Sequence, residues 1–335
     1  MNRIEKTERK INYLRISITD RCNLRCVYCM PEKIPSVPHE EILRYEEIIG
    51  IAEAAAKEGI RHIRLTGGEP LVRKDCAALV GGLKKIPGIE TVSLTTNGIL
   101  LSDQIGELKK AGLDGVNISL DTTDGEHFKR ITGTDGKDTV LKAIGDSFDA
   151  GLMTKINVAV MEDTKPEEIL SLVKLSENRS IHVRFIEMMP IGCGARFKTV
   201  DNDQILSVIR EKYPDIRPEE KDAVTDRLKC GYGPARYYRI PGFPGSTGFI
   251  SAVHHKFCGD CNRLRLTSTG FLKYCLCFDN GEDLRKIIRS DLPAEEIKKR
   301  LGEAFRNAAV HKPEGHCFDS PEKISEKKPM VDIGG

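Results

Sequence analysis

The sequence predicts an α/β fold in which parallel strands alternate with helices. Six short strand-like runs are each followed by a segment with helical periodicity, an order that gives parallel strands joined by right-handed crossovers. The runs also alternate apolar and polar residues, whereas parallel strands buried on both faces are continuously apolar. Six strand–helix units favour a barrel, or an open three-quarter barrel, over a flat doubly wound sheet.

The predicted elements follow one another in chain order. Strands are expected at residues 13–19, 62–66, 91–95, 116–120, 155–160 and 182–186. Helices are expected at residues 46–58, 74–85, 101–111 and 139–150, and a further helix opens at Pro166. Glycine is favoured just after a helix and proline in its first turn, which supports these bounds at Gly59, Gly112, Gly151 and Pro166.

The alternation within the strands predicts a polar barrel interior. Successive side chains of a strand point to opposite faces, so one face is apolar and packs on the helices. The other face carries Arg15, Arg64, Lys155 and Arg184. A closed eight-stranded barrel fills its interior with branched apolar residues, so a cationic interior implies a cavity for an anionic ligand. An antiparallel sheet with one solvated face would also alternate, but the intervening helices argue against it.

Three cysteines follow the first strand within eight residues. Cys22, Cys26 and Cys29 are spaced Cys-x3-Cys-x2-Cys, in a loop at the end of a strand where such folds carry function. Thiolates this close can reach three corners of one iron–sulfur cluster and leave one iron open for a ligand. Structural zinc is the alternative, although zinc sites usually draw ligands in Cys-x2-Cys or Cys-x2-His pairs.

The next two loops are rich in glycine. Gly67-Gly68-Glu69 follows the second strand, and paired glycines let the backbone approach a ligand closely. Gly-Gly by itself is also an ordinary turn. Asn97-Gly98 follows the third strand and is a strong turn signal, so a turn and a functional role both stay open there.

A second cysteine set lies in the C-terminal part, beyond one helix and a charged linker at about 199–224. Strand-like runs are expected there at 235–241, 248–252, 264–268 and 270–274. Cys258 and Cys261 form a Cys-x2-Cys pair, and Cys275 follows after thirteen intervening residues. Cys277 makes a four-cysteine zinc site an open alternative.

Two arginines and the tail complete the C-terminal part. Arg263 and Arg265 lie two apart on a strand and face the same way, as an anion clamp or as a solvated face. The charged tail at 320–329 is expected to be mobile.

Composition restricts the class of protein. The chain has 335 residues, enough for one large α/β domain or a domain with an extension. A net charge of +2 argues against nucleic-acid binding through a basic surface. No apolar signal segment opens the chain, and no run approaches the ~20 apolar residues of a membrane helix. Of eleven cysteines, six fall in two clusters, which favours metal binding in a reducing cytoplasm without membrane contact.

Taken together, these stretches resemble the GTP 3′,8-cyclase family of radical S-adenosylmethionine (SAM) enzymes. The first cysteines match the superfamily signature Cys-x3-Cys-x-aromatic-Cys, with Tyr28 as the aromatic residue, and residues 67–69 match its Gly-Gly-Glu motif. The match to the cyclase family runs through LRISITDRCNLRCVYCMP at 14–31, RLTGGEPLV at 64–72, TTNG at 95–98, NISLD at 117–121, KIN at 155–157, RFIEMMP at 184–190, FCGDCNRLRL at 257–266, the stretch 270–276 and Ile-Gly-Gly at 333–335.

The resemblance implies a fold and an activity. The fold would be an incomplete (βα)6 TIM-type barrel, closed by a mixed α+β C-terminal segment. Residues 6–225 would form the core and residues 226–335 the C-terminal segment with a second cluster. The enzyme, a lyase, would convert GTP to 3′,8-cyclo-7,8-dihydro-GTP, the first step of molybdenum cofactor (molybdopterin) biosynthesis. A 5′-deoxyadenosyl radical would take hydrogen from C3′ of GTP. The chain has no Gly-x4-Gly-Lys-Ser/Thr motif, so the phosphates would meet the cationic interior.

The resemblance also implies roles for individual residues. The first [4Fe-4S] cluster would be held by Cys22, Cys26 and Cys29, and the second by Cys258, Cys261 and Cys275. SAM would be lined by Tyr28, Gly68, Ser119 and Met189. GTP would be bound by Arg15, Arg64, Thr95, Lys155, Arg263, Leu264 and Arg265. Arg184, Gly334 and Gly335 would lie at the active site. Cys277 departs from the family pattern and could compete as a ligand, and Cys193 is expected to be a free thiol near the barrel mouth.

The partners implied are GTP, SAM and an electron donor. A homodimer and hand-over of the product to the cyclic pyranopterin monophosphate synthase are further family expectations. Two alternatives remain open at this point. One is a radical SAM enzyme that modifies a peptide, since such enzymes also carry auxiliary clusters. The other is a zinc-stabilised nucleotide- or RNA-binding protein without redox chemistry.

Overall fold

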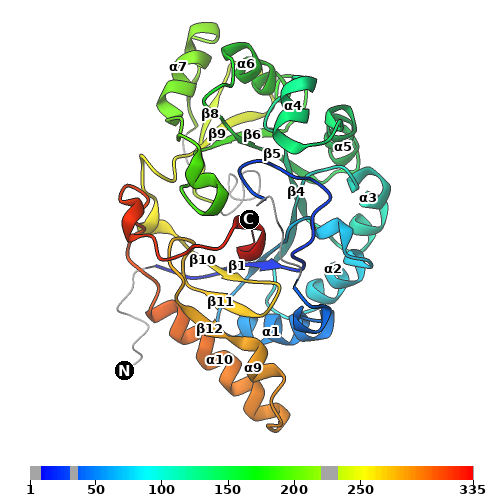
Figure 1. The fold of residues 1–335 in the computed structure, drawn as a ribbon. Helices are drawn as coiled ribbons and strands as arrows, with labels where there is room; N and C mark the ends of the chain where they lie inside the picture. The colour runs from blue at the N-terminus through cyan, green and yellow to red at the C-terminus, as the bar shows by residue number, and fades with distance from the viewer. Residues whose placement is uncertain (1–8, 31–36, 220–232, 335) are drawn as a thin grey trace.

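The computed structural model describes residues 9–30, 37–219 and 233–334, which form one twelve-stranded sheet with helices on its outer side. Figure 1 shows the strands curving around an interior in which the C-terminus lies, with α1 to α7 arranged outside them. Eight consecutive strands, β10, β1 to β6 and β9, pair in parallel. The strand order begins at β12 and ends at β7, so within the described residues the sheet is open.

Six strand–helix units build the core, and all six predicted strands are confirmed to within two residues at either end. The strands are β1 (Tyr13–Ser17), β2 (His62–Thr66), β3 (Thr91–Thr96), β4 (Gly115–Ser119), β5 (Met153–Ala159) and β6 (His182–Ile186). The helices are α1 (Tyr45–Lys57), α2 (Cys76–Lys84), α3 (Leu101–Lys110), α4 (Gly125–Thr132), α5 (Lys137–Asp149), α6 (Pro166–Lys174) and α7 (Asn202–Lys212).

Helix α4 is the element of the core that the sequence analysis missed. The Asp124 carboxylate accepts a hydrogen bond from the His127 backbone N–H at 2.7 Å and caps its start. Gly133, with φ of 74°, caps its end. Both capping residues were visible in the sequence, but the helix has only 8 residues, too few for a clear apolar period.

The C-terminal segment extends the core sheet at both edges. Its strands are β8 (Arg236–Arg239), β9 (Ser246–Ile250), β10 (Arg263–Leu266), β11 (Phe271–Lys273) and β12 (Gly281–Asp283), and β7 (Arg217–Pro218), at the end of the core, pairs with β8. It also contributes α9 (Leu284–Ile288), α10 (Ala294–Val310) and α11 (Met330–Ile333). Because β9 joins β6 and β10 joins β1, this segment reaches both sides of the barrel mouth. The predicted domain boundary near residue 225 lies outside the described residues.

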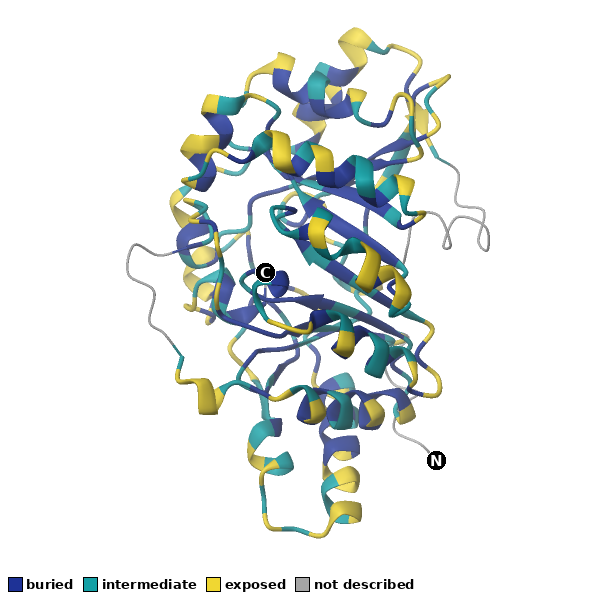
Figure 2. Cartoon of the chain, turned by 90° about the vertical axis from the view of Figure 1, so that its right-hand side faces the viewer, coloured by how far each residue is buried: buried dark blue, intermediate teal, exposed yellow. Residues whose placement is uncertain are grey.

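The predicted alternation of the strands is confirmed. Leu14 and Ile16 of β1 are fully buried, as are Ile63 and Leu65 of β2, and they pack with the helices in one apolar cluster. Figure 2 shows the buried strands beneath helices whose outer sides are exposed. The polar residues between them face the interior, so the fold leaves a polar cavity inside the curved sheet.

The prediction of a mobile tail at residues 320–329 is wrong. Ile324 and Glu326 are 4% exposed, and the Glu326 carboxylate pairs with the ammonium group of Lys273. Ile324 and Ile333 also pack in a second apolar cluster, together with Cys277. The tail is therefore docked on the body, because its few apolar side chains and one buried ion pair outweigh its charged composition.

Among the described residues, no helix has the length and apolar character needed to cross a membrane.

Candidate active site

A cavity of about 290 Å³ lies inside the curved sheet and collects most of the predicted site residues. Its lining combines polar residues of β1 to β6 with residues of the C-terminal segment. The predicted site residues that line it are Arg15, Tyr28, Arg64, Thr95, Ser119, Lys155, Arg184, Met189, Cys258, Cys261, Arg263, Arg265 and Cys275. Two segments far apart in the sequence thus share one site.

Three arginines form a row across neighbouring strands of the cavity wall. Arg265 of β10 is in register with Arg15 of β1, and Arg15 is in register with Arg64 of β2. Like charges directly opposite one another are destabilising. Burial, followed by Arg265 and Arg64, lowers the pKa of Arg15 well below its usual value. Burial and Arg263 lower the pKa of Arg265 to about 10. A bound anion would relieve this repulsion, so the row suits a multiply charged ligand.

Other donors at the wall are only partly satisfied. Arg64 donates to the Tyr13 hydroxyl through Nε and to Thr95 Oγ1 at 3.4 Å. Arg184 donates through Nη2 to Asn157 Oδ1. The Nε atoms of Arg184 and Arg263 are buried and have no hydrogen-bond partner in the described structure. Buried donors normally have partners, so these atoms indicate a ligand.

The first cysteine triad is held in place by contacts within its own loop and with the loop after β3. The Cys22 thiol accepts from the Leu24 N–H at 3.4 Å and lies 3.9 Å from Asn97 Nδ2, in the loop after β3. A turn at Cys26 brings Cys29 close, with the Cys29 N–H donating to the Cys26 carbonyl at 3.0 Å. Burial and the neighbouring Cys22 raise the pKa of Cys29 to about 12. The three thiols are thus mutual neighbours at the end of β1.

The two glycines of the second loop are required by the cysteine loop itself. A Cβ at Gly67 would lie 2.7 Å from the Thr19 carbonyl oxygen, and one at Gly68 would lie 2.3 Å from that of Arg21. The Gly68 N–H donates to the Thr19 carbonyl at 2.8 Å. The close approach expected for Gly68 is therefore seen here between two loops of the chain.

Glu69 ties the loops together, a role that the sequence analysis did not assign. Its buried carboxylate accepts from the Leu71 N–H at 3.0 Å, from Thr96 Oγ1 at 2.8 Å and from the Asn97 N–H at 2.7 Å. Its own N–H donates to the Arg21 carbonyl at 2.7 Å. The Gly-Gly-Glu motif was the signal, but its glutamate points into the protein.

Tyr28 is anchored by a second residue that was missed. Its hydroxyl donates to Asp121 Oδ2 at 2.6 Å, and Asp121 Oδ1 accepts from the Ala159 N–H at 2.8 Å. Burial raises the pKa of Asp121 and that of Tyr28. This contact joins the cysteine loop to the ends of β4 and β5 and fixes the Tyr28 ring against the cavity.

The second cysteine triad lies at the C-terminal side of the cavity. Cys258 begins a short 3-10 helix (Cys258–Asp260), Cys261 precedes β10, and Cys275 follows β11. The Cys258 thiol accepts from the His316 N–H at 3.4 Å. Burial alone would raise the pKa of Cys261, but the positive charges of Arg263 and Lys312 lower it below its usual value. Lys312 and His316 also line the cavity and were missed.

The donor set of each triad fits an iron–sulfur cluster. Each triad offers three free thiols, and a four-iron cluster held by three cysteines keeps one iron open for a ligand. Structural zinc instead takes four protein ligands in a closed tetrahedron. The residues present fit two four-iron clusters.

Cys277 does not compete at the second triad. It is fully buried in the apolar cluster behind the cavity, and its Sγ lies 3.2 Å from Sγ of Cys317. Leu276 separates Cys277 from Cys275, and Cys277 does not line the cavity. The expectation of ligand competition is therefore corrected. Cys193 is buried and, as expected, free.

Six described residues of the predicted site do not line the cavity: Cys22, Cys26, Cys29, Gly68, Leu264 and Gly334. Leu264 is 1% exposed, and its side chain packs in the core on the other face of β10. The Gly334 carbonyl accepts from Arg265 Nη1 at 2.8 Å, so the tail reaches the row of arginines. A Cβ at Gly334 would lie 3.0 Å from that of Ser17. Gly335 lies outside the described residues.

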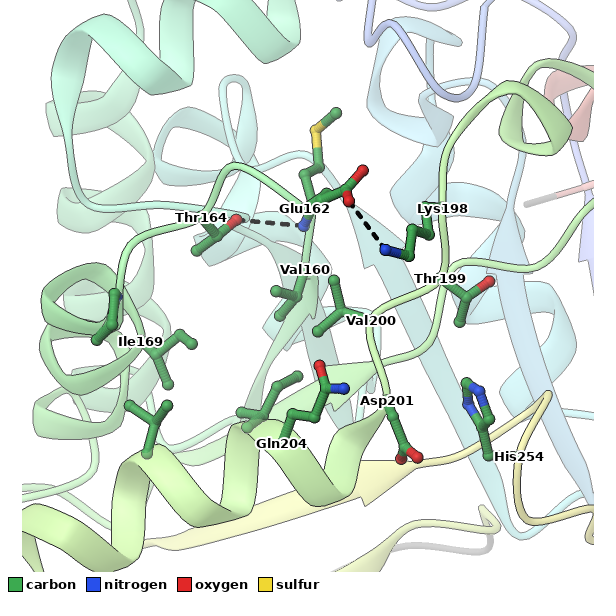
Figure 3. A pocket seen from close by; sticks show the side chains of 14 residues that line it. Val160, Glu162, Thr164, Ile169, Lys198, Thr199, Val200, Asp201, Gln204 and His254 are labelled. Carbon is green, nitrogen blue, oxygen red and sulfur yellow. Dashed lines mark hydrogen bonds and ion pairs between the residues drawn. The ribbon is translucent and has the colours of Figure 1, made fainter.

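A second hollow of about 490 Å³ lies between the loop after β5 and helix α7 (Figure 3). Its lining includes Val160, Ile169 and Val200, and an ion pair in which Lys198 Nζ lies 3.1 Å from Glu162 Oε1. No predicted site residue lines it. The candidate active site is the cavity inside the sheet.

Comparisons with known proteins agree with this geometry. Residues 16–176 match the family model described as the Radical SAM superfamily, and residues 181–318 match Molybdenum Cofactor Synthesis C. A relative from Clostridium perfringens named GTP 3′,8-cyclase is 43% identical over 332 residues, covering 99% of each chain. One of the same name from Heliobacterium modesticaldum is 44% identical and covers 99% of this chain and 100% of its own.

A solved structure of Streptococcus suis SuiB bound to precursor peptide SuiA aligns with a TM-score of 0.62 over 97% of this chain and 76% of its own. At 16% identity, this likeness supports the fold alone. The family is shown by the relatives that share the whole chain and both cysteine-bearing regions. The chain belongs to the GTP 3′,8-cyclase family of the radical SAM superfamily.

Proposed function

We propose that the chain converts GTP to 3′,8-cyclo-7,8-dihydro-GTP in the cavity inside the sheet, as the first step of molybdenum cofactor biosynthesis. The observation that carries the proposal is the row of Arg265, Arg15 and Arg64. It lies in a cavity lined by the second cysteine triad and by Tyr28 of the first cysteine loop. The negative charge of a triphosphate would neutralise the repulsion among these three arginines. Arginine is also suited to bidentate contacts with phosphate.

The two cysteine triads would hold the two [4Fe-4S] clusters, and Tyr28, Gly68, Ser119 and Met189 would hold SAM beside the first. These groups would supply the radical chemistry: one electron from the reduced first cluster would cleave SAM, the resulting 5′-deoxyadenosyl radical would take hydrogen from C3′ of GTP, and closing the C3′–C8 bond to the dihydro product would take up one further electron and one proton.

The chain itself contributes orientation and the exclusion of water. Reacting atoms must be held roughly 3–3.5 Å apart. In our proposal Arg15, Arg64, Thr95, Lys155, Arg263 and Arg265 grip the triphosphate and ribose, and Arg184 lies close by. The guanine faces Cys258, Cys261 and Cys275. Leu264 would contact GTP only through its backbone, because its side chain is in the core. The C-terminal residues Gly334 and Gly335 would cover the site from the mouth of the barrel.

We further infer the setting of the reaction. All ten described cysteines are free, which supports a reducing cytoplasm. Residues 6–225 would act as the SAM-binding core and residues 226–335 as the segment that recognises GTP. A homodimer, an electron donor and hand-over of the product to the cyclic pyranopterin monophosphate synthase complete the proposal.

An anaerobic assay tests the function. The protein is reconstituted with iron and sulfide and given dithionite and SAM, with GTP, with ATP or with no nucleotide. We expect 5′-deoxyadenosine to rise with GTP only, together with a cyclic GTP-derived product detected by mass spectrometry. Equal slow formation in every tube would withdraw GTP as the substrate and favour a peptide. Cys22→Ser should abolish SAM cleavage, and cleavage at the parent rate would refute the first cluster site.

The arginine row makes a separate prediction. Arg265→Ala or Arg15→Ala removes a charged hydrogen-bond donor worth about 1.5–3 kcal/mol, so kcat/KM for GTP should fall roughly 10- to 150-fold. Iron content should stay unchanged. Arg300→Ala on α10, whose partner is Glu296 at the surface, is the matched control and should keep the parent kinetics. Parent kinetics in Arg265→Ala would refute the clamp.

A further inference from the structure

We propose that Lys312 is a positioning residue for the second cysteine triad. Its ammonium group ties together the two chain segments that carry Cys261 and Cys275 and places a positive charge beside their thiolates. The inference rests on the proposed function, because it takes this triad to be a cluster site.

The hydrogen bonds of Lys312 connect the two ends of one hairpin. Its Nζ donates to the carbonyl oxygen of Arg263 at 2.7 Å and to that of Tyr274 at 2.7 Å. Arg263 follows Cys261 by two residues, and Tyr274 directly precedes Cys275. Strands β10 and β11 pair in antiparallel fashion, with Arg265 opposite Lys273. Lys312 therefore bridges the hairpin at the end where both cysteines emerge.

Burial makes this lysine unusual. It is 6% exposed, and lysine is almost never buried without a charged partner. Lys273 has such a partner in Glu326, but no carboxylate in the described part of the chain forms an ion pair with Lys312. The groups of opposite charge that face it are instead Cys261 and Cys275, as thiolates. Two of its three N–H donors serve carbonyls, which leaves the third for the thiol of Cys261.

The segment that follows α10 secures the remaining cysteine as well. Arg9 donates to the Cys258 carbonyl at 3.1 Å, to the Pro313 carbonyl at 2.9 Å and to the Lys312 carbonyl at 3.1 Å. The His316 N–H donates to the Cys258 thiol. Residues 312–316 thus contact the neighbourhood of all three cysteines, and Lys312 is the member whose side chain acts on Cys261 and Cys275.

The charge has a chemical consequence. Partners of metal ligands commonly change metal affinity by about 10- to 100-fold when they are removed. The net charge and hydrogen bonds around an iron–sulfur cluster set its reduction potential. A nearby positive charge favours the reduced, more negative cluster. Loss of Lys312 should therefore weaken iron retention and shift the potential to more negative values.

The test uses the full chain carrying Cys22→Ala, Cys26→Ala and Cys29→Ala, so that only the second site can bind a cluster. Lys312→Met, Lys312→Gln and Lys312→Arg are compared in this background. Lys84→Met on α2, which removes a partly exposed lysine paired with Asp114, is the control. After anaerobic reconstitution, two quantities are measured: the rate of iron loss to a chelator, and the potential by redox titration followed by electron paramagnetic resonance. Neither depends on turnover.

We expect Lys312→Met to lose iron about 10-fold faster or more and to have a lower potential than the parent. Lys312→Arg, which keeps the charge, should restore the potential. Lys312→Gln keeps N–H donors but carries no charge. Its reduction potential should therefore be as low as that of Lys312→Met, even if its melting temperature equals that of the parent. That variant also covers the case in which Lys312→Met fails to fold.

Parent-like retention and potential in Lys312→Met or Lys312→Gln would overturn the role of Lys312 and leave the proposed function intact. A parent that binds no cluster at all would contradict the second cluster site itself, and with it both proposals.

Discussion

Polar residues on the inner face of the strands carry most of the site, and their alternation along each strand explains how. In β1, Arg15 faces the cavity, whereas Leu14 and Ile16 on either side of it are fully buried against the helices. The same spacing places Arg263 and Arg265 at the cavity and Leu264 in the core. A one-residue shift in either strand would reverse these roles. Single side chains therefore have a fixed function only because the register is fixed.

Gly68 gives the sharpest prediction for a single residue. Gly68→Ala would place a Cβ 2.3 Å from the Arg21 carbonyl oxygen, a contact that only movement of the cysteine loop can relieve. We expect this variant to lose most of the iron bound at the first site while the second site stays loaded. Iron and sulfide analysis in a background without Cys258, Cys261 and Cys275 measures the first site alone.

Gly106→Ala is the matched control. Nothing lies within 4 Å of the position of its added Cβ, and it sits inside α3. Alanine in a helix interior is more stable than glycine by about 0.5–1 kcal/mol, so this variant should be slightly stabilised and keep its iron. Full iron at the first site in Gly68→Ala would contradict the close contact between the two loops.

Only some of the site residues could be predicted from the sequence. Residues such as Cys22 and Arg265 could be predicted because each belongs to a short motif whose residues are neighbours in the sequence. Asp121 and Lys312 could not be, because their importance depends on partners distant in the chain, Tyr28 at one site and Tyr274 at the other. Glu69 was visible in a motif, yet its inward direction follows only from the folded loops.

At the scale of elements, the docked tail is stabilised by one buried ion pair. Glu326→Ala would leave the Lys273 ammonium group, which is 2% exposed, without its carboxylate. Breaking a buried pair at one partner typically costs about 3–5 kcal/mol. We expect a decrease of that size in the free energy of unfolding, measured by denaturant titration, and faster proteolysis within residues 320–334.

Glu295→Ala provides the comparison for the tail. Its carboxylate pairs with Lys298 on the exposed face of α10, at 2.8 Å. Exposed pairs contribute little, so this variant should unfold like the parent. Equal stability of the two variants would show that the tail is not held by the Lys273–Glu326 pair.

Strand β2 carries a prediction for acid pH. Burial lowers the pKa of His62 to about 4, from an ordinary value near 6.5. The unfolded chain therefore binds a proton at His62 between pH 6.5 and 4 that the folded chain does not bind. The stability that neutral His62 contributes is present above pH 6.5 and is lost as the pH falls towards 4, by at most about 1.4 kcal/mol per pH unit.

His62→Asn tests this, because asparagine keeps a polar group near Thr91 Oγ1 and does not titrate. The free energy of unfolding of the variant should depend less steeply on pH between 4 and 6.5 than that of the parent. His311→Asn, at an exposed position after α10, should leave the pH dependence unchanged. Parallel curves for parent and His62→Asn would refute the burial effect.

The elements differ in how well the sequence predicted them. Strands β1 to β6 were found because six repeated units reinforce one pattern. Helix α4 was missed because it is short, and the pairing of β10 with β1 could not be foreseen because some 250 residues separate them. That pairing depends on tertiary structure, yet it places Arg265 beside Arg15 and so creates the site.

On the scale of the whole molecule, the two ends of the chain close one cavity. The C-terminal segment adds β9 beside β6 and β10 beside β1, and α11 brings Gly334 to the arginine row. Figure 1 shows the C-terminus at the centre of the curved sheet. The core therefore carries only part of the site, and the C-terminal segment supplies the second triad together with Arg263 and Arg265.

Transfer of a labelled hydrogen from C3′ of GTP tests the proposed reaction at the reacting carbon. The reconstituted protein is given SAM, dithionite and GTP that carries deuterium only at C3′, and the 5′-deoxyadenosine is analysed by mass spectrometry. We expect one deuterium in the 5′-deoxyadenosine, and none when the deuterium of GTP is at C2′ instead. Deuterium from C2′, or unlabelled 5′-deoxyadenosine from C3′-labelled GTP, would contradict the proposed reaction.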